Sequence, residues 1–143
     1  MVYSKIMENS AAGFQEVEHA ADWALRVWAP QLSGLLEQAG RGMLSLAGVK
    51  VADGPPRECE IEISFLDREQ LLVKFLSEIL YFIEQENLAF TEYDLSLDRD
   101  RLKARLRGYP IRSLEKAIKA VTYHNLEVRQ TERGYEAYIV FDV

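Results

Sequence analysis

Apolar and polar residues alternate along several stretches of the chain, a pattern that is typical of half-buried β-strands. The stretch 58–65 shows it clearly, because Cys59, Ile61 and Ile63 fall on one face while glutamates fall on the other. The expected strands are 13–19, 23–29, 58–65, 88–98, 101–109, 122–130 and 134–142. The adjacent stretches at 88–109 and at 122–142 each predict a β-hairpin.

Other stretches repeat apolar residues at helical spacing. Residues 31–47 and 67–86 each predict a long amphipathic helix, and Asp67 with Gln70 resembles a capping box at the start of the second. A short helix is expected to begin at Ser113, with these apolar residues on one face: Leu114, Ala117, Ile118 and Val121.

The order of these elements predicts an α+β domain with a mostly antiparallel sheet, packed by two long helices and one short helix. Gly40 and Gly42 weaken the first helix by about 1 kcal/mol each relative to alanine, and they favour close packing against a neighbour. Residues 1–12 are polar and small. We therefore expect a flexible leader over 1–12 and a single domain over 13–143.

The charge and the cysteine count limit the possible functions. The 143 residues carry a net charge of −6, which argues against a general nucleic-acid binder, because such proteins are usually basic. The single cysteine, Cys59, excludes an internal disulfide and a multi-cysteine metal site, and fits a reducing cytoplasm. We expect no signal peptide, because the first residues lack an apolar core, and no apolar run is long enough to span a bilayer. We expect a soluble, cytoplasmic protein without a membrane partner.

Four cations share one face of a predicted strand: Arg101, Lys103, Arg105 and Arg107. They could bind RNA phosphates. A two-residue turn at Arg99–Asp100, however, places four polar residues opposite them: Asp98, Ser96, Asp94 and Glu92. Cross-strand pairing is favoured over a phosphate track, because no aromatic residues are interleaved for base stacking. The acidic face of Glu58, Glu60 and Glu62 is either solvated or a contact for a basic partner, and the sequence leaves both open.

Motifs for nucleophilic catalysis or for phosphate binding are not found in the sequence. Cys59 belongs to the apolar set of its strand, which favours a packed thiol over a nucleophile. His19 and His124 each flank a predicted strand, where a lone histidine is more often hydrogen-bonded structure than a ligand. No catalytic residue is assigned.

Three acidic groups lie beside predicted strands: Asp22, Asp142 and the terminal carboxylate of Val143. A carboxylate in an apolar setting is costly unless a cation or hydrogen bonds stabilise it. If the last strand lies beside the strand that begins at Trp23, the three carboxylates could converge. Oxygen ligands select Ca²⁺, Mg²⁺ or Mn²⁺ rather than zinc. Exposed strand ends would explain the same acids equally well.

At these residues the sequence resembles the archease family. The segments that carry the resemblance are HAADWALRVWAP at 19–30, KAIKAVTYHNL at 116–126 and YIVFDV at 138–143. Their order and spacing also match, so the resemblance covers about 14–143. One departure is Ala20, where the first motif of the family has threonine, but Asp22 is kept.

The resemblance implies strand–helix–strand–strand units and a cytoplasmic, non-enzymatic protein that assists the RtcB-type tRNA-splicing RNA ligase. Such an activator promotes guanylylation of the ligase and its multiple turnover in tRNA splicing and RNA repair, and it meets RNA only through the ligase. The resemblance also implies a divalent cation, calcium first and magnesium or manganese as alternatives, on Asp22, Asp142 and Val143. Functional roles in ligase activation are expected for Lys119, His19 and His124.

Two other functions stay open on the residues alone. A metal-dependent hydrolase could hold its ion on Asp22 and Asp142 and use His19 or His124 as a base. Turnover without a partner would favour it. An RNA-binding chaperone could use the stripe at 101–107, although the acidic balance counts against it. Salt-dependent RNA binding by the isolated protein would favour that function.

Overall fold

The computed structural model describes residues 11–18 and 23–143. Most of the predicted leader, as well as His19 and Asp22, lies outside these ranges. The described residues form nine strands and two helices: β1 Gly13–Glu18, β2 Trp23–Ala29, α2 Leu32–Leu46, β3 Lys50–Val51, β4 Arg57–Ser64, α3 Arg68–Glu86, β5 Leu88–Leu97, β6 Arg101–Ser113, β7 Ala120–Val121, β8 Val128–Thr131 and β9 Gly134–Asp142. Neither of these helices is long and apolar enough to cross a membrane.

The first sheet joins strands from the two ends of the chain. β2 lies between β1 and β9 and is antiparallel to both, with Trp23 opposite Phe141. β7 and β8 both pair with the other side of β9. β9 is thus an interior strand, and the consecutive residues Ile139, Val140 and Phe141 are all buried, which explains why its sequence is apolar almost to its last residue.

The second sheet is built around β6, the longest strand. β4 and β5 flank β6 along 101–110, and β3 pairs with the end of β6 at 111–113. All of these pairings are antiparallel, as the sequence predicts. The predicted hairpin of β5 and β6 is confirmed, and β4 and β5 form the two long edges of the sheet.

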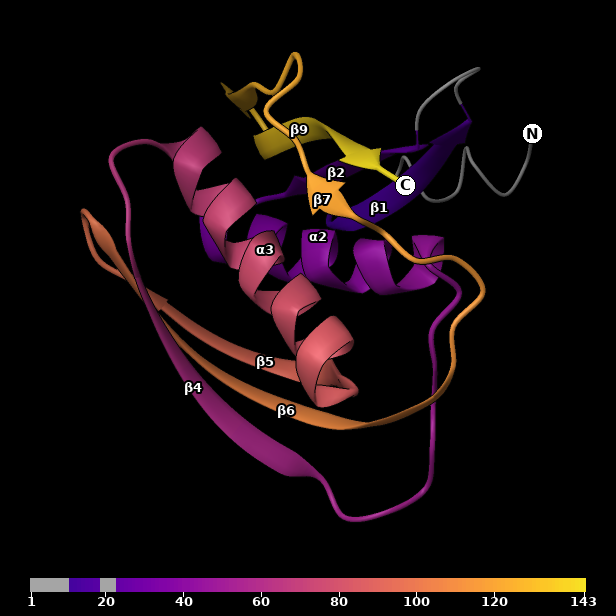
Figure 1. Ribbon diagram of the computed structural model, residues 1–143. Coiled ribbons are helices and arrows are strands. Elements are labelled where there is room, and N and C mark those ends of the chain that lie inside the picture. The colour runs from indigo at the N-terminus through magenta and orange to yellow at the C-terminus, as the bar shows by residue number, and fades with distance from the viewer. Residues whose placement is uncertain (1–10, 19–22) are drawn as a thin grey trace.

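The two helices lie between the two sheets (Figure 1). α2 contacts β1 and β2 on one side and β5 on the other, while α3 contacts β4, β5 and β7. The core between the layers contains large, fully buried side chains from every layer, among them Leu25, Met43, Phe75, Leu102 and Phe141. The arrangement differs from the expected single sheet covered by helices, because the helices use opposite faces to contact two separate sheets.

Two glycines allow α2 to fit between these layers, as the sequence predicts. A Cβ atom on Gly42 would lie 2.5 Å from Cδ2 of Leu25 in β2. A Cβ atom on Gly40 would lie 2.6 Å from the hydroxyl of Tyr93 in β5. Gly42 therefore faces the first sheet and Gly40 the second, and each gives space to a side chain from the opposing strand.

The start of α3 agrees with the predicted capping box. The side chain of Asp67 accepts a hydrogen bond from the backbone N–H of Gln70 at 2.7 Å. Oε1 of Gln70 in turn accepts from the N–H of Leu66 at 2.8 Å, one residue earlier than in the usual capping box. The helix ends at Asn87, which adopts a left-handed conformation with φ of 50°.

The predicted short helix from Ser113 is wrong, so the described residues have two helices rather than three. In a helix, the N–H of Lys119 would bind the carbonyl of Glu115. It donates instead to the carbonyl of Asp142 at 2.7 Å, while the N–H groups of Glu115 and Lys116 both donate to the carbonyl of Ala47 at 3.0 Å. Partners distant in sequence therefore override the helical spacing of this segment.

The predicted strand at 122–130 is interrupted. Only 128–130 belongs to a strand, β8, because β7 already ends at Val121, and a turn before β8 is closed by a hydrogen bond from the N–H of Leu126 to the carbonyl of Tyr123 at 3.0 Å. Asn125 in this turn has φ of 52°, a left-handed conformation that asparagine tolerates better than most residues. The turn allows β7 and β8 to pair with the same side of β9.

Candidate functional site

The end of β9 is fixed to the segment that carries Lys119. Ala120 lies opposite Asp142, and the N–H of Lys119 donates to the carbonyl of Asp142 at 2.7 Å. Thr122 donates both its N–H, at 3.1 Å, and its hydroxyl, at 2.9 Å, to the carbonyl of Val140. The exposed Asp142, in β9, is therefore held beside the exposed Lys119, which directly precedes β7.

The other side of β9 faces the start of β2. Trp23 pairs with Phe141 there, and Asp22, which precedes Trp23 in the chain, lies outside the described residues. Nζ of Lys116 lies 4.1 Å from the centre of the Trp23 ring. Such a cation–π contact is worth about 0.5–2 kcal/mol and ties the segment before β7 to β2. Sequence reasoning missed Lys116, because no local pattern connects residues so far apart in the chain.

His124 lies further from the end of β9 than Lys119 does. Its N–H donates to Oγ1 of Thr122 at 3.2 Å, and its Nε2 lies 3.3 Å from Nδ2 of Asn125. Since Thr122 already binds Val140, the chain at His124 is running away from Asp142. The register thus brings Lys119 to Asp142 but does not bring His124 there.

The donor atoms at the end of β9 have the chemistry of a site for a hard cation. The side chain of Asp142 is exposed, and Val143, which carries the terminal carboxylate, packs its half-buried side chain against the core. Oxygen donors of this kind suit Ca²⁺, Mg²⁺ or Mn²⁺. Over residues 11–18 and 23–143, no three His, Cys, Asp or Glu side chains come together as a metal site. The predicted convergence with Asp22 stays a prediction.

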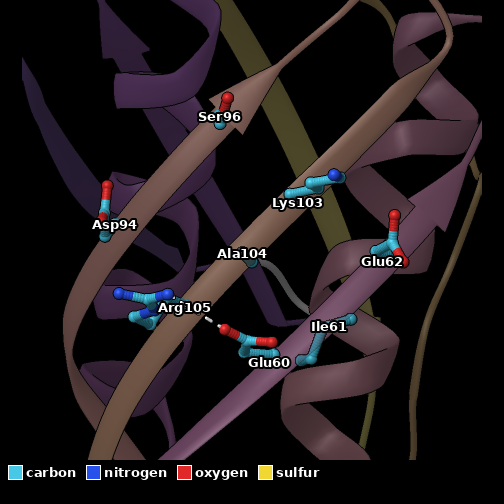
Figure 2. Close-up of a pocket in the computed structure, with 8 residues that line it drawn as sticks. All are labelled: Glu60, Ile61, Glu62, Asp94, Ser96, Lys103, Ala104 and Arg105. Atoms are coloured by element: carbon cyan, nitrogen blue, oxygen red, sulfur yellow. Dashed lines mark hydrogen bonds and ion pairs between the residues drawn. The ribbon is translucent and has the colours of Figure 1, made fainter.

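The basic stripe on β6 is paired with acids from both neighbouring strands. Arg105 contacts Glu60 at 3.1 Å, and Arg107 contacts Glu58 at 3.4 Å and Glu92 at 3.8 Å. The predicted positions opposite β5 are confirmed, but most of the ion pairs lead to β4, as Figure 2 shows for Arg105 and Glu60. The stripe is thus already neutralised along much of its length, which removes the main support for a phosphate track.

The fold and this site define a small α+β protein in which two antiparallel sheets enclose two helices and β9 ends beside a lysine-bearing segment. The archease protein family matches residues 14–143, and the chain belongs to this family. The archease of Methanopyrus kandleri is 31% identical over 91% of this chain and 99% of its own length. The archease of Methanosarcina barkeri is 30% identical over 96% of this chain and 100% of its own length.

Solved structures agree with this assignment. A crystal structure of an archease from Thermotoga maritima, described as a possible chaperone, is 25% identical with a TM-score of 0.67 and covers 90% of this chain and 96% of its own. The solution structure of protein 1598 from Methanobacterium thermoautotrophicum is 25% identical with a TM-score of 0.68 and covers 92% of this chain and 99% of its own. The resemblance drawn from the three motifs is confirmed.

Proposed function

We propose that this archease is a cytoplasmic, non-enzymatic activator of an RtcB-type tRNA-splicing RNA ligase. It would promote guanylylation of the ligase and so support multiple turnover in tRNA splicing and RNA repair. Membership of the archease family supports the proposal, and the description of the Thermotoga maritima relative as a possible chaperone fits a protein that acts on another protein. The observation that carries it is the pairing of the Lys119 segment with Asp142 at the end of β9.

In this proposal a divalent cation, calcium first, binds to Asp142, the terminal carboxylate of Val143 and Asp22. The bound ion would add a positive charge that a phosphate or carboxylate of the ligase can ligate. β2 and β7 pair with Phe141 on the two sides of β9, and the backbone N–H of the exposed Lys119 binds the carbonyl of Asp142. Both features would let the chain present charge to a partner without reorganising.

The competing functions lose support. An RNA chaperone needs free cations, but Arg101, Arg105 and Arg107 all form ion pairs with glutamates. A hydrolase needs a base near its metal; the chain at His124 runs away from Asp142, and the other candidate base, His19, lies outside the described residues. Activation through contact with the ligase requires neither feature.

Multiple-turnover RNA ligation by the cognate ligase with GTP tests the proposal. Wild type is expected to allow repeated turnover, whereas Asp142→Ala should reduce the stimulation by about tenfold or more, as expected when a metal ligand is lost. A C-terminal extension that turns the Val143 carboxylate into an amide should also reduce the stimulation of ligation. Asp94→Ala is the matched control, because Asp94 is also an exposed acid but lies on β5 in the other sheet.

Each variant is first checked for folding by circular dichroism, so that lost stimulation reports on the site. Equal ligation with and without wild type would refute the activator function. Full stimulation by both Asp142→Ala and the extended chain would leave activation standing and refute the role of this site in it.

A further inference from the structure

β4 is an open and regular edge of the second sheet. It pairs with β6 through an unbroken register from Arg57 opposite Gly108 to Ser64 opposite Arg101, and within the described part of the chain β6 is its only partner strand. The opposite edge, β5, is interrupted by a register shift between Phe90 and Glu92. Bulges and prolines are common protections of edge strands, and β4 has neither.

The direction of the backbone groups of β4 follows from its hydrogen bonds. The N–H of Phe65 donates to the carbonyl of Asp100 at 3.0 Å, which continues the β4–β6 register. In an antiparallel ladder the hydrogen-bonded positions alternate, so the odd-numbered residues of β4 face β6 and the even-numbered residues face outward. The carbonyl of Ser64 agrees, because it is reached from outside by Nζ of Lys74 at 2.8 Å. The outward N–H and C=O groups are those of Glu58, Glu60 and Glu62.

The charges on the outer face of this sheet alternate from strand to strand. Glu92 of β5, Arg107 of β6 and Glu58 of β4 form one such row, with ion-pair distances of 3.8 Å and 3.4 Å. Glu60 ends a second row beside Arg105, as Figure 2 shows. The Glu60 side chain remains 74% exposed. A strand added beyond β4 would continue the alternation if it carried cations on this face.

A second copy of this chain does not fit the edge. If two β4 strands paired antiparallel about a two-fold axis with their apolar faces on the same side, Glu60 would lie opposite Glu62 or opposite its own copy. Directly opposed like charges destabilise a strand pair. Each of these glutamates already pairs with an arginine of β6 on one side, and a basic strand would meet it on its other side.

The inner side of the edge offers an apolar contact. Lys74 and Glu86 of α3 contact the two ends of β4, through the carbonyl of Ser64 and an ion pair with Arg57 at 3.0 Å. Tyr81 follows Lys74 by seven positions, which places both on the same face of α3. Tyr81 as a residue is 52% exposed, so an apolar residue of an added strand could pack against its ring.

We infer that β4 is a docking edge for an extended segment of a partner protein in which Lys or Arg alternates with apolar residues. The segment adds a strand to the second sheet by bonding the outward N–H and C=O groups of Glu58, Glu60 and Glu62. Its cations meet the three glutamates, and its apolar residues lie toward Tyr81. This surface is separate from the end of β9, so the inference does not depend on ligase activation.

Amide hydrogen exchange with a short synthetic peptide of alternating Lys and Val tests the inference. The N–H groups of Glu58, Glu60 and Glu62 are expected to exchange fast in the free chain and to become protected when the peptide is added. The N–H groups of Cys59, Ile61 and Ile63 already face β6 and should change little. A peptide of alternating Glu and Val is the control for charge and should not bind.

Glu60→Pro removes an outward N–H without removing a bond to β6, and proline is tolerated at such edge positions. It should lower the affinity for the Lys–Val peptide by about tenfold or more. The double variant Glu60→Gln/Glu62→Gln avoids any backbone strain and should weaken binding and reduce its salt dependence. Asp94→Asn, on the same face at the opposite edge, is the matched control and should bind like wild type.

Several results would overturn the inference. Binding that is unchanged in both the proline and the glutamine variants would do so, as would protection that appears on β5 instead of β4. Equal binding of the Glu–Val peptide would show that charge does not select the partner. Protection of the Glu60 amide that rises with protein concentration in the absence of peptide would identify a second copy as the occupant.

Discussion

Replacing Gly42 with alanine tests whether α2 is held as closely between the sheets as the structure indicates. The new Cβ would lie 2.5 Å and 2.9 Å from the two δ carbons of Leu25 and 3.0 Å from Cγ of Phe14. Carbon atoms attract each other best at about 3.5–4.0 Å, so neighbours on both β1 and β2 would have to move by roughly 1 Å. Leu25 is fully buried and has no solvent space to turn into.

The expected effect is the difference between two opposing terms. Alanine is favoured over glycine in a helix by about 1 kcal/mol. Overpacking a well-packed core costs about 1–3 kcal/mol, and contacts this short with a fully buried leucine favour the upper end of that range. We therefore expect Gly42→Ala to lower the free energy of unfolding by about 2 kcal/mol, although alanine has a higher helix propensity than glycine.

Urea unfolding followed by circular dichroism measures this change. Gly34→Ala is the matched control, because it makes the same substitution in the same helix but its Cβ meets only the Cβ of Ala29, at 3.2 Å. The control should be more stable than Gly42→Ala by at least about 1 kcal/mol, since it keeps the gain in helix propensity with little crowding. A Gly42→Ala protein as stable as wild type, or more so, would refute the close packing of α2 on β1 and β2.

Two further predictions concern contacts elsewhere in the layers. Oε2 of Glu69 accepts a hydrogen bond from the N–H of Val128 at 2.8 Å, so Glu69→Ala should cost about 1–3 kcal/mol in urea unfolding, whereas Glu69→Gln keeps an acceptor and should cost less. Equal losses in both variants would contradict this. Burial raises the pKa of the Tyr93 phenol above its ordinary value, so the folded state holds this proton more tightly than the unfolded state does. This difference contributes fully to the free energy of unfolding below about pH 10. The contribution is lost as the pH rises through the pKa of the folded state, and the free energy of unfolding then falls by up to about 1.4 kcal/mol per pH unit. Tyr93→Phe should therefore flatten the alkaline decline in unfolding free energy, and identical slopes for variant and wild type would exclude the phenol as its source.

The elements that could be predicted from sequence are those whose own periodicity decides their structure. α2, α3, β4 and the hairpin of β5 and β6 carry apolar residues at clear helical or strand spacing, and their bounds agree closely with the predictions. Alternation tells which face of a strand is buried, but it does not tell which strands are neighbours. The division into two sheets with helices between them was therefore beyond the sequence, although the glycines of α2 indicated close packing against a neighbour.

The candidate site shows the opposite case, in which contacts distant in sequence decide the local structure. β7 has only two residues, too few for any pattern, and it exists because β9 offers an open side to Ala120 and Val121. The spacing from Leu114 to Val121 favours a helix when that partner is ignored, but the same partner binds the backbone N–H of Lys119 through the carbonyl of Asp142. The sequence identified Lys119 and Asp142 by motif, and the strand register explains how they come together. The segment that carries Lys119 thus depends on β9 for its conformation. A change that disturbs either the segment or β9 should therefore displace both Lys119 and Asp142.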